Sequence, residues 1–216
     1  MPLAGKGMLI TSMDVDAGDE QEYNIWYDRE HLAERVAIDG FLEARRWIAV
    51  DAKPKYFCTY STAKFEDLSG PAYLRALANQ TDRSRQNIAR FKNMVRAVGR
   101  ITGSRGQGRG AALAVVRLRP APGDRTSRGK VQALLDPGML PGIISLHLIE
   151  SDPQLSKSLT EPDQPNPGAA DWFVLVEGTD VPAVQALARE RFANTGAAVV
   201  STGTYRLMWD LSKSDL

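Results

Sequence analysis

The segment best suited to chemistry is the run EYNIWYDREHLAERVAIDGF at residues 22–41. His31 could move a proton at neutral pH, because an unperturbed imidazole titrates near ~6.5. Glu30 and Glu34 are four residues apart and therefore adjacent on a helix. Two close carboxylates in a pocket raise the pKa of one of them, which suits a general acid. The spacing predicts proton-transfer chemistry, with an ion pair to Arg35, Arg45 or Arg46 as the alternative for either glutamate and the favoured one for Glu34.

A regular helix from about Asp19 to Ala37, with Asp19 as its N-cap, would carry these groups. At ~100° per residue, one face of this helix collects aromatic and acidic side chains, with His31 at its edge. The side chains on this face are Tyr23, Trp26, Tyr27, Glu30 and Glu34, and the opposite stripe holds Ile25, Leu32 and Val36. We expect the aromatic face to pack toward a sheet, so its charged groups must find partners or border a polar cavity.

Other side chains of the first half could complete a binding pocket. Arg45 or Arg46 could hold a substrate carboxylate. Tyr27 and Tyr56 carry hydroxyls that need partners, whereas Trp26 suits ordinary core as well as a pocket wall. The predicted binding residues are Tyr23, Trp26, Glu34, Arg45, Arg46, Trp47 and Tyr56.

Two similar halves must position these groups. The first is predicted to contain strand 7–15, helix 19–37, strands 41–50 and 56–62, helices 71–79 and 81–90, and strand 91–102. The second is predicted to contain strand 111–120, helix 124–135, strand 143–151, an irregular loop over 152–170, strand 171–178, helix 181–193 and strand 197–211. Each half therefore follows the β-α-β-β-α-β order of a ferredoxin-like unit. Such a unit leaves one apolar sheet face uncovered, so we expect an α+β fold in which two tandem units form an α/β barrel.

A glycine-rich run, ITGSRGQGRG at 101–110, is predicted as the linker between the halves. We place one domain at 1–105, carrying the site, and a second at 106–216. The second half has GKVQALLDPGML where the first has its aromatic, histidine and glutamate motif, so we expect it to be a structural partner. Its only histidine, His147, aligns with Arg45 and could face either the helices or the barrel interior.

The run WYDREHLAERVAIDGFLEARRW resembles the signature of the dimeric α/β-barrel superfamily, and more narrowly that of its EthD-like, poorly characterised members. The resemblance is strongest over 7–80 and only topological over 111–216. It implies a pocket between the sheet and the helices of the first half. Relatives include polyketide cyclases, muconolactone-type isomerases, cofactor-free monooxygenases, and haem-dependent peroxidases and dismutases. The matching positions are Trp26, Tyr27, Asp28, Glu30, His31, Glu34 and Arg35, and Ala33 stands where the family often has proline.

Composition excludes several classes of protein. With 43% hydrophobic and 25% charged residues, the 216-residue chain is globular rather than disordered. Its single cysteine, Cys58, excludes an intrachain disulfide and a cysteine-rich zinc site, and we expect a buried, inert thiol. Apolar runs are too short to span a bilayer, and the sequence lacks a signal-peptide pattern, so we expect a cytoplasmic protein.

The sequence fits three further kinds of site less well. Residues 82–130 hold thirteen bases against two acids, but no aromatic-interleaved motif accompanies them, which favours a solvated face over nucleic-acid binding. His31 and Glu34 have metal-ligand spacing, yet a metal site needs three or four ligands. Haem would need His31 or His147 as its axial ligand, and neither has a supporting motif. We therefore predict no metal and no cofactor.

These patterns together predict a cofactor-independent acid/base enzyme of isomerase, cyclase or lyase type, acting on a small aromatic or organic acid. His31 would be the general base or acid, Glu30 would orient or protonate it, and Tyr27 would donate a hydrogen bond to developing oxygen charge. The alternative is a non-catalytic small-molecule-binding or assembly module. The expected partner is a small-molecule ligand, without nucleic acid or membrane, and a homodimer remains open.

Overall fold

Most strands read as continuous apolar runs because both faces of the sheet are covered. The structure is a computed structural model that describes residues 3–157 and 166–216. In it, β1 (Gly7–Asp14) and β3 (Tyr56–Thr62) are buried along nearly their whole length. One face of each strand packs under helices, and the other lines the inside of a barrel.

The helices and strands follow the expected order. The other elements of the first half are α1 (Glu20–Trp26), a π-helical segment (Tyr27–His31), α2 (Leu32–Ala37), β2 (Phe41–Asp51), a 3-10 turn (Phe65–Ser69), α3 (Pro71–Ala78), α4 (Asp82–Ile88) and β4 (Lys92–Gly106). Those of the second half are β5 (Ala112–Arg119), α5 (Arg125–Ala133), β6 (Ile143–Ser151), β7 (Trp172–Gly178), α6 (Val181–Arg191), β8 (Ala198–Ser212) and a final 3-10 turn (Lys213–Asp215).

The strands form one closed antiparallel barrel in the order β1-β3-β2-β8-β5-β7-β6-β4. Within each half the order is that of a ferredoxin-like unit, β4-β1-β3-β2 and β8-β5-β7-β6. The pairings β2 with β8 and β4 with β6 join the halves. The predicted α+β fold of two tandem ferredoxin-like units is thus confirmed, and the barrel closes within one chain.

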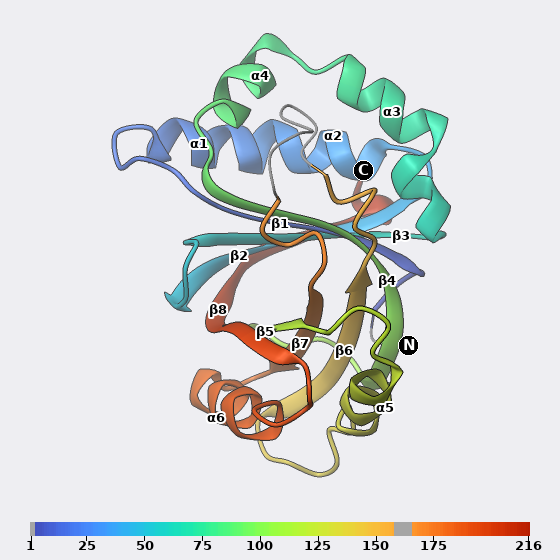
Figure 1. The fold of residues 1–216 in the computed structure, drawn as a ribbon. Helices are drawn as coiled ribbons and strands as arrows, with labels where there is room; N and C mark the ends of the chain where they lie inside the picture. Colours follow the sequence, from blue (N-terminus) through green and yellow to red (C-terminus); the bar gives the residue numbers. More distant parts are fainter. Residues whose placement is uncertain (1–2, 158–165) are drawn as a thin grey trace.

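Helices cover the barrel on two opposite sides (Figure 1). The helices α1 to α4 lie over the sheet of the first half, and α5 and α6 lie over that of the second. Three apolar clusters result, one under each helical layer and one inside the barrel. The interior cluster includes Trp47, Phe57, Phe173 and Tyr205.

The glycine-rich run at 101–110 is mostly strand, which corrects its prediction as a linker. β4 continues to Gly106, and its end pairs with β6. The glycines permit this close pairing: a Cβ on Gly106, whose φ is +94°, would lie 2.2 Å from the carbonyl oxygen of Ile144. Only 107–111 connects the last strand of the first half to β5.

The segment after β6 crosses from the second half onto the first. Asp152 N donates to Val98 O at 2.8 Å, and Val98 N donates to the Ser156 hydroxyl at 2.8 Å. Arg96 Nη1 donates to Leu155 O at 2.7 Å, and Leu155 packs against the apolar cluster under α1. The central part of the loop predicted over 152–170 lies outside the described residues. Among the helices in the described part of the chain, none has the length and apolarity needed to cross a membrane.

Candidate functional site

The helix that carries the sequence motif is interrupted by a π-helical segment, Tyr27–His31, between α1 and α2. A π turn advances each residue by a smaller angle than an α turn, so the regular wheel fails beyond Trp26. Leu32 and Val36, assigned to an opposite stripe, are fully buried, whereas Ile25 is 46% exposed. The expected side-chain cap by Asp19 is also absent, because Asp19 faces Arg90 at 3.4 Å instead.

His31 lies buried among aromatic rings. Its ring centroid is 4.4 Å from that of Trp26, 4.9 Å from that of Tyr27 and 6.4 Å from that of Tyr60. Burial, followed by the positive charges of Arg35 and Arg46, holds the pKa of His31 well below its ordinary value. The imidazole is therefore neutral at pH 7 and able to accept a proton.

One nitrogen of this ring and one nitrogen of the nearby Arg35 lack hydrogen-bond partners in the described residues. Nδ1 of His31 and Nη1 of Arg35 are buried without a hydrogen bond to any described residue. Arg35 is only 5% exposed, and it forms no ion pair within the described part of the chain. The Thr11 hydroxyl, which faces the helices from β1, likewise has no partner in the part of the chain that the structure describes. Because an unsatisfied buried polar group costs about 1–3 kcal/mol, such a group marks a candidate for ligand contact.

Tyr27 and Tyr60 add a pair of hydroxyls to the same face. Their oxygens are 2.6 Å apart, and both side chains are fully buried. Burial, before any other effect, raises the pKa of each phenol, so both stay protonated. One hydroxyl proton bridges the pair, which leaves the other available as a donor.

Arg46 has an ion-pair partner, in contrast to Arg35, although its Nε has no hydrogen-bond partner among the described residues. Its guanidinium is ion-paired with Asp28 and donates to Asn24 Oδ1 at 2.5 Å. It also lies over the rings of Tyr27 at 4.6 Å and of Tyr23 and Tyr56 at 5.1 Å. Trp209 from β8 donates to the same Asp28 oxygen at 2.7 Å. Arg46 therefore ties the motif helix to β2 and to the second half.

Tyr23, Trp26 and Tyr56 have partners in the same layer. The Tyr23 hydroxyl reaches Met13 Sδ at 3.3 Å. The Tyr56 hydroxyl lies 3.2 Å from Asn24 Nδ2 and 3.3 Å from Glu20 Oε1. These three predicted binding residues thus lie with Tyr27 and Arg46 between the first-half sheet and its helices.

Glu30 and Glu34 face α4 rather than the sheet. Glu30 accepts from Thr81 Oγ1 at 2.7 Å and from Arg83 Nη1 at 3.3 Å. The Ser84 hydroxyl lies 3.5 Å from Glu30 and 3.4 Å from Glu34. Burial, with the neighbouring Glu30 carboxylate, raises the pKa of Glu34. The carboxylates do interact, but neither is hydrogen-bonded to His31 in the described structure.

Ser84 connects this acidic pair to the aromatic site. Trp26 Nε1 donates to the Ser84 hydroxyl at 3.0 Å, and the Trp26 ring packs on His31. Glu34 was expected to pair with Arg35, Arg45 or Arg46, but the described residues include no such ion pair. The pair of glutamates therefore positions α4 and Trp26 rather than His31 directly.

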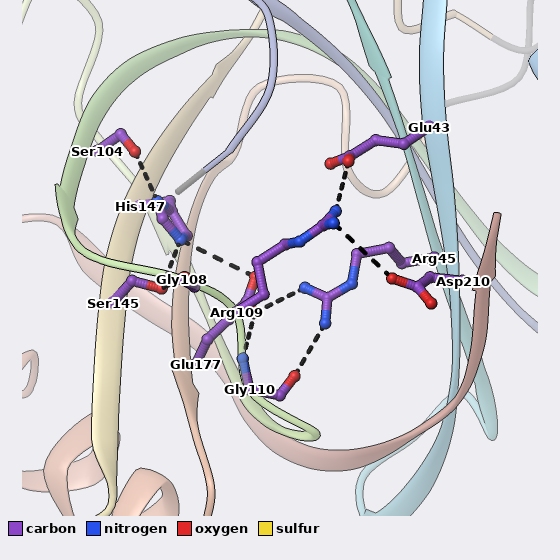
Figure 2. Close-up of polar contacts among 10 residues, drawn as sticks. All are labelled: Glu43, Arg45, Ser104, Gly108, Arg109, Gly110, Ser145, His147, Glu177 and Asp210. Atoms are coloured by element: carbon purple, nitrogen blue, oxygen red, sulfur yellow. Dashed lines mark hydrogen bonds and ion pairs between the residues drawn. The ribbon is translucent and has the colours of Figure 1, made fainter. Parts of the chain in front are cut away.

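Arg45 (Figure 2) lies on the opposite face of β2, inside the barrel, and Trp47 lies there too, in the interior cluster. Arg45 Nη1 is 2.6 Å from Glu177 Oε2, its Nη2 donates to Gly110 O at 2.8 Å, and its guanidinium lies 4.4 Å from the Trp47 ring. Strand alternation accounts for this, because neighbours such as Arg45 and Arg46 point to opposite faces. The structure does not bring Arg45 or Trp47 together with His31.

His147 also faces the barrel interior. Its Nδ1 lies 3.0 Å from the Ser104 hydroxyl, and its Nε2 lies 3.1 Å from the Ser145 hydroxyl (Figure 2). Burial, and then the charge of Arg45, lowers the pKa of His147 to about 3. The second half thus uses its histidine in a closed polar network at one end of the barrel.

Arg35 and Tyr60 are the residues whose importance sequence reasoning missed. Arg35 was expected to serve as a partner for Glu34, and Tyr60 was not singled out. Alternation from Tyr56 through Cys58 to Tyr60 could have placed Tyr60 on the helix-facing side. Cys58 lies there too, and burial raises the pKa of its thiol to about 11.

The surroundings of the two histidines do not fit an axial haem ligand. Such a ligand needs an imidazole nitrogen that faces a slot wide enough for a porphyrin. Both ring nitrogens of His147 face serine hydroxyls, and the ring of His31 is enclosed by Trp26 and Tyr27. Among residues 3–157 and 166–216, no three metal-ligating side chains gather into a cluster.

Comparison with known proteins bears on the fold. No protein-family model matches the chain, and no curated protein does. A solved structure described as an anthrone oxidase-like protein superposes with a TM-score of 0.66 at 12% identity, covering 98% of this chain and 95% of that one. The chain has the ferredoxin-like α/β-barrel fold. A putative monooxygenase from Fusobacterium nucleatum aligns at TM-score 0.58 and 11% identity, covering 97% and 95% of the two chains.

A structure described as a putative chlorite dismutase aligns at TM-score 0.55 and 13% identity, covering 99% of this chain and 97% of that one. At such identities the likeness shows the fold alone. Proteins described as enzymes or enzyme-like therefore share this barrel fold. Any reaction proposed for this chain must be argued from its own residues.

Proposed function

We propose that this protein is an acid/base enzyme that acts, without a cofactor, on a small aromatic or organic acid between the first-half sheet and its helices. The observation that carries the proposal is a pair of buried atoms one helical turn apart, His31 Nδ1 and Arg35 Nη1, which have no hydrogen-bond partner in residues 3–157 and 166–216. A neutral base beside an unpaired cation is suited to removing a proton and stabilising the anion that forms.

The charges give this pair a specific property. In the free protein, Arg35 contributes to the low pKa of His31. A carboxylate or enolate bound to the guanidinium would offset that positive charge and raise the pKa of His31. His31 would thus become a stronger base when an anionic substrate is present. Before the substrate binds, the low pKa of His31 keeps its ring neutral, so the ring is able to accept the substrate's proton.

Other groups have supporting roles in the proposal. In the Tyr27–Tyr60 pair, the hydroxyl group whose proton is not shared between the two oxygens would donate a hydrogen bond to negative charge that develops on a substrate oxygen. Glu30 would hold α4 over the site through Thr81 and Arg83. The first domain, 1–105, would carry the reaction, and the second, 106–216, would complete the barrel. The resemblance of residues 26–47 to the motif of EthD-like proteins supports this placement, because the matching positions include His31 and Arg35.

A thermal-shift screen of small aromatic and carboxylic acids tests the proposal. A ligand at 100 times its Kd should add about 2.7 kcal/mol to the free energy of unfolding. We expect hits that disappear in His31→Gln and Arg35→Met but remain in Arg29→Met, because Arg29 is exposed on the same helix. A screen in which every hit survives both site variants would contradict this location.

Turnover separates an enzyme from the alternative, a small-molecule-binding or assembly module. A ligand that binds at His31 and Arg35 and is recovered unchanged would favour the binding module. Because two structural neighbours are described as monooxygenase or anthrone oxidase-like, each hit should also be tested for oxygen consumption. Oxygen uptake dependent on His31 would move the reaction class from isomerase, cyclase or lyase to oxygenase.

A further inference from the structure

A cavity of about 200 Å³ lies at one end of the barrel, apart from the helix–sheet site. Its walls come from six strands and from the turn between β2 and β3. It is at the opposite end of β2 from Arg45, since β2 begins at Phe41 and ends at Asp51, next to that turn. The residues around it are Ser12, Lys53, Pro54, Phe57, Val95, Val115, Arg117, Phe173, Ser201, Thr202, Gly203 and Tyr205.

The inner walls are apolar and aromatic. Phe57 and Tyr205 pack with ring centroids 5.2 Å apart, and Phe173 lies opposite them in the interior cluster. An apolar cavity of roughly 150 Å³ accommodates benzene in other proteins. A volume of about 200 Å³ therefore has room for one aromatic ring with a small substituent.

The mouth carries excess positive charge. Arg117 and Arg119 share one buried carboxylate, Asp171, at 2.7 Å each, so the three groups together retain one positive charge. Lys53 is exposed at the rim, and no lining residue is acidic. Nε and Nη2 of Arg117 face Asp171 and Pro167 O, while Nη1 has no hydrogen-bond partner among the described residues.

The strand edge beside the cavity offers further polar groups. β8 pairs with β5 from Ala198 onward but with β2 only from Thr204 onward. Among the described residues, the backbone of 201–203, which lines the cavity, therefore pairs with a strand on one edge only, and Ala52 lies close to it at Gly203. The other edge can donate to or accept from a bound molecule.

We propose that this cavity binds a small aromatic carboxylate, with its ring between Phe57 and Phe173 and its carboxylate toward Arg117 and Lys53. Charge and shape both select this class. A neutral ring would leave the positive mouth unused, and a larger acid would exceed the volume. The inference is independent of the proposed reaction at His31.

Binding of 4-fluorobenzoate, followed by fluorine NMR and isothermal titration, tests the proposal. Ser201 is half-buried on β8 opposite Arg117, and aromatic residues are compatible with a strand. We expect Ser201→Phe to fill the cavity and weaken binding at least tenfold. Removing the exposed rim charge in Lys53→Gln should weaken binding by roughly two- to fivefold, as for other exposed charges. Neutral fluorobenzene derivatives should bind more weakly than the acid.

The site variants His31→Gln and Arg35→Met distinguish this cavity from the helix–sheet site. We expect both to retain the binding that Ser201→Phe removes. Chemical-shift changes on the methyl groups of Val95 and Val115 should accompany it, and they provide a reading independent of the Ser201→Phe variant. Absence of saturable binding, or binding that His31→Gln removes and Ser201→Phe leaves intact, would overturn the proposal.

Discussion

His147 is buried in its neutral form, which makes the stability of this protein sensitive to acid. The pKa of His147 is lowered from its ordinary value of 6.5 to about 3, by burial first and by Arg45 second. The unfolded chain takes up a proton at this residue as the pH falls below 6.5, while the folded chain does not. The stabilising contribution of His147 is therefore fully present above pH 6.5 and is lost as the pH falls toward about 3.

The size of the effect follows from that interval. Each pH unit between the two pKa values changes the free energy of unfolding by about 1.4 kcal/mol for one titrating group. Between pH 8 and pH 5, His147 should therefore remove about 2 kcal/mol of stability. His31 acts in the same direction, because its pKa is also lowered. The wild-type loss thus contains contributions from both histidines.

His147→Gln isolates the contribution of one ring. Glutamine can still hydrogen-bond to Ser104 and Ser145 but takes up no proton in this range. Urea unfolding at pH 8 and pH 5, followed by tryptophan fluorescence, should show a smaller acid-induced loss in the variant, by about 2 kcal/mol. The chain has two histidines, so the wild-type ring signal can be assigned and should not titrate above pH 4. An equal loss in both proteins would refute the argument.

The remaining predictions concern the candidate site and Gly106 at the end of β4. Arg35→Met should raise the free energy of unfolding by roughly 1–3 kcal/mol in denaturant titrations, because it removes a buried charge that has no ion-pair partner among the described residues. Arg29→Met should change little, and a loss of stability in Arg35→Met would give Arg35 a structural role. A bound aromatic carboxylate at the helix–sheet site should raise the pKa of His31 in NMR titrations, whereas an unchanged pKa would place the anion elsewhere. Gly106→Ala should lower the melting temperature, because its φ is +94° and its Cβ would meet a carbonyl at 2.2 Å; Gly129→Ala, inside α5 with open space around it, should raise it slightly, and a reversed order would contradict the pairing of β4 with β6.

The order of strands along the chain could be predicted from the sequence, because the strands are long apolar runs separated by turns that contain glycine and proline. The pairs Lys53-Pro54 and Pro141-Gly142, which are typical of turns, lie just outside the observed strands β2, β3 and β6. The glycine run ending β4 misled the prediction, since the same flexibility that suits a linker also permits close strand pairing. The pairing with β6 makes the run a strand rather than a linker, and a single sequence does not reveal such a tertiary contact.

The candidate site was only partly predictable. The aromatic face from Tyr23 to Tyr27 was placed correctly, because α1 is a regular helix up to Trp26. The π-helical segment then turned Glu30 and Glu34 toward α4, and no periodicity rule includes such a segment. The unpaired state of Arg35 was not readable either, since it depends on which acids the fold leaves out of reach.

Solvent-deuterium exchange tests the central claim most directly. Ligands found in the thermal-shift screen would be incubated with the protein in D₂O, and loss of their C–H signals would be followed by proton NMR. We predict that the wild-type protein and Arg29→Met exchange an acidic C–H or form a rearranged product, while His31→Gln and Arg35→Met do neither. Exchange that persists in His31→Gln, or its absence for every ligand that binds at this site, would contradict acid/base catalysis by His31.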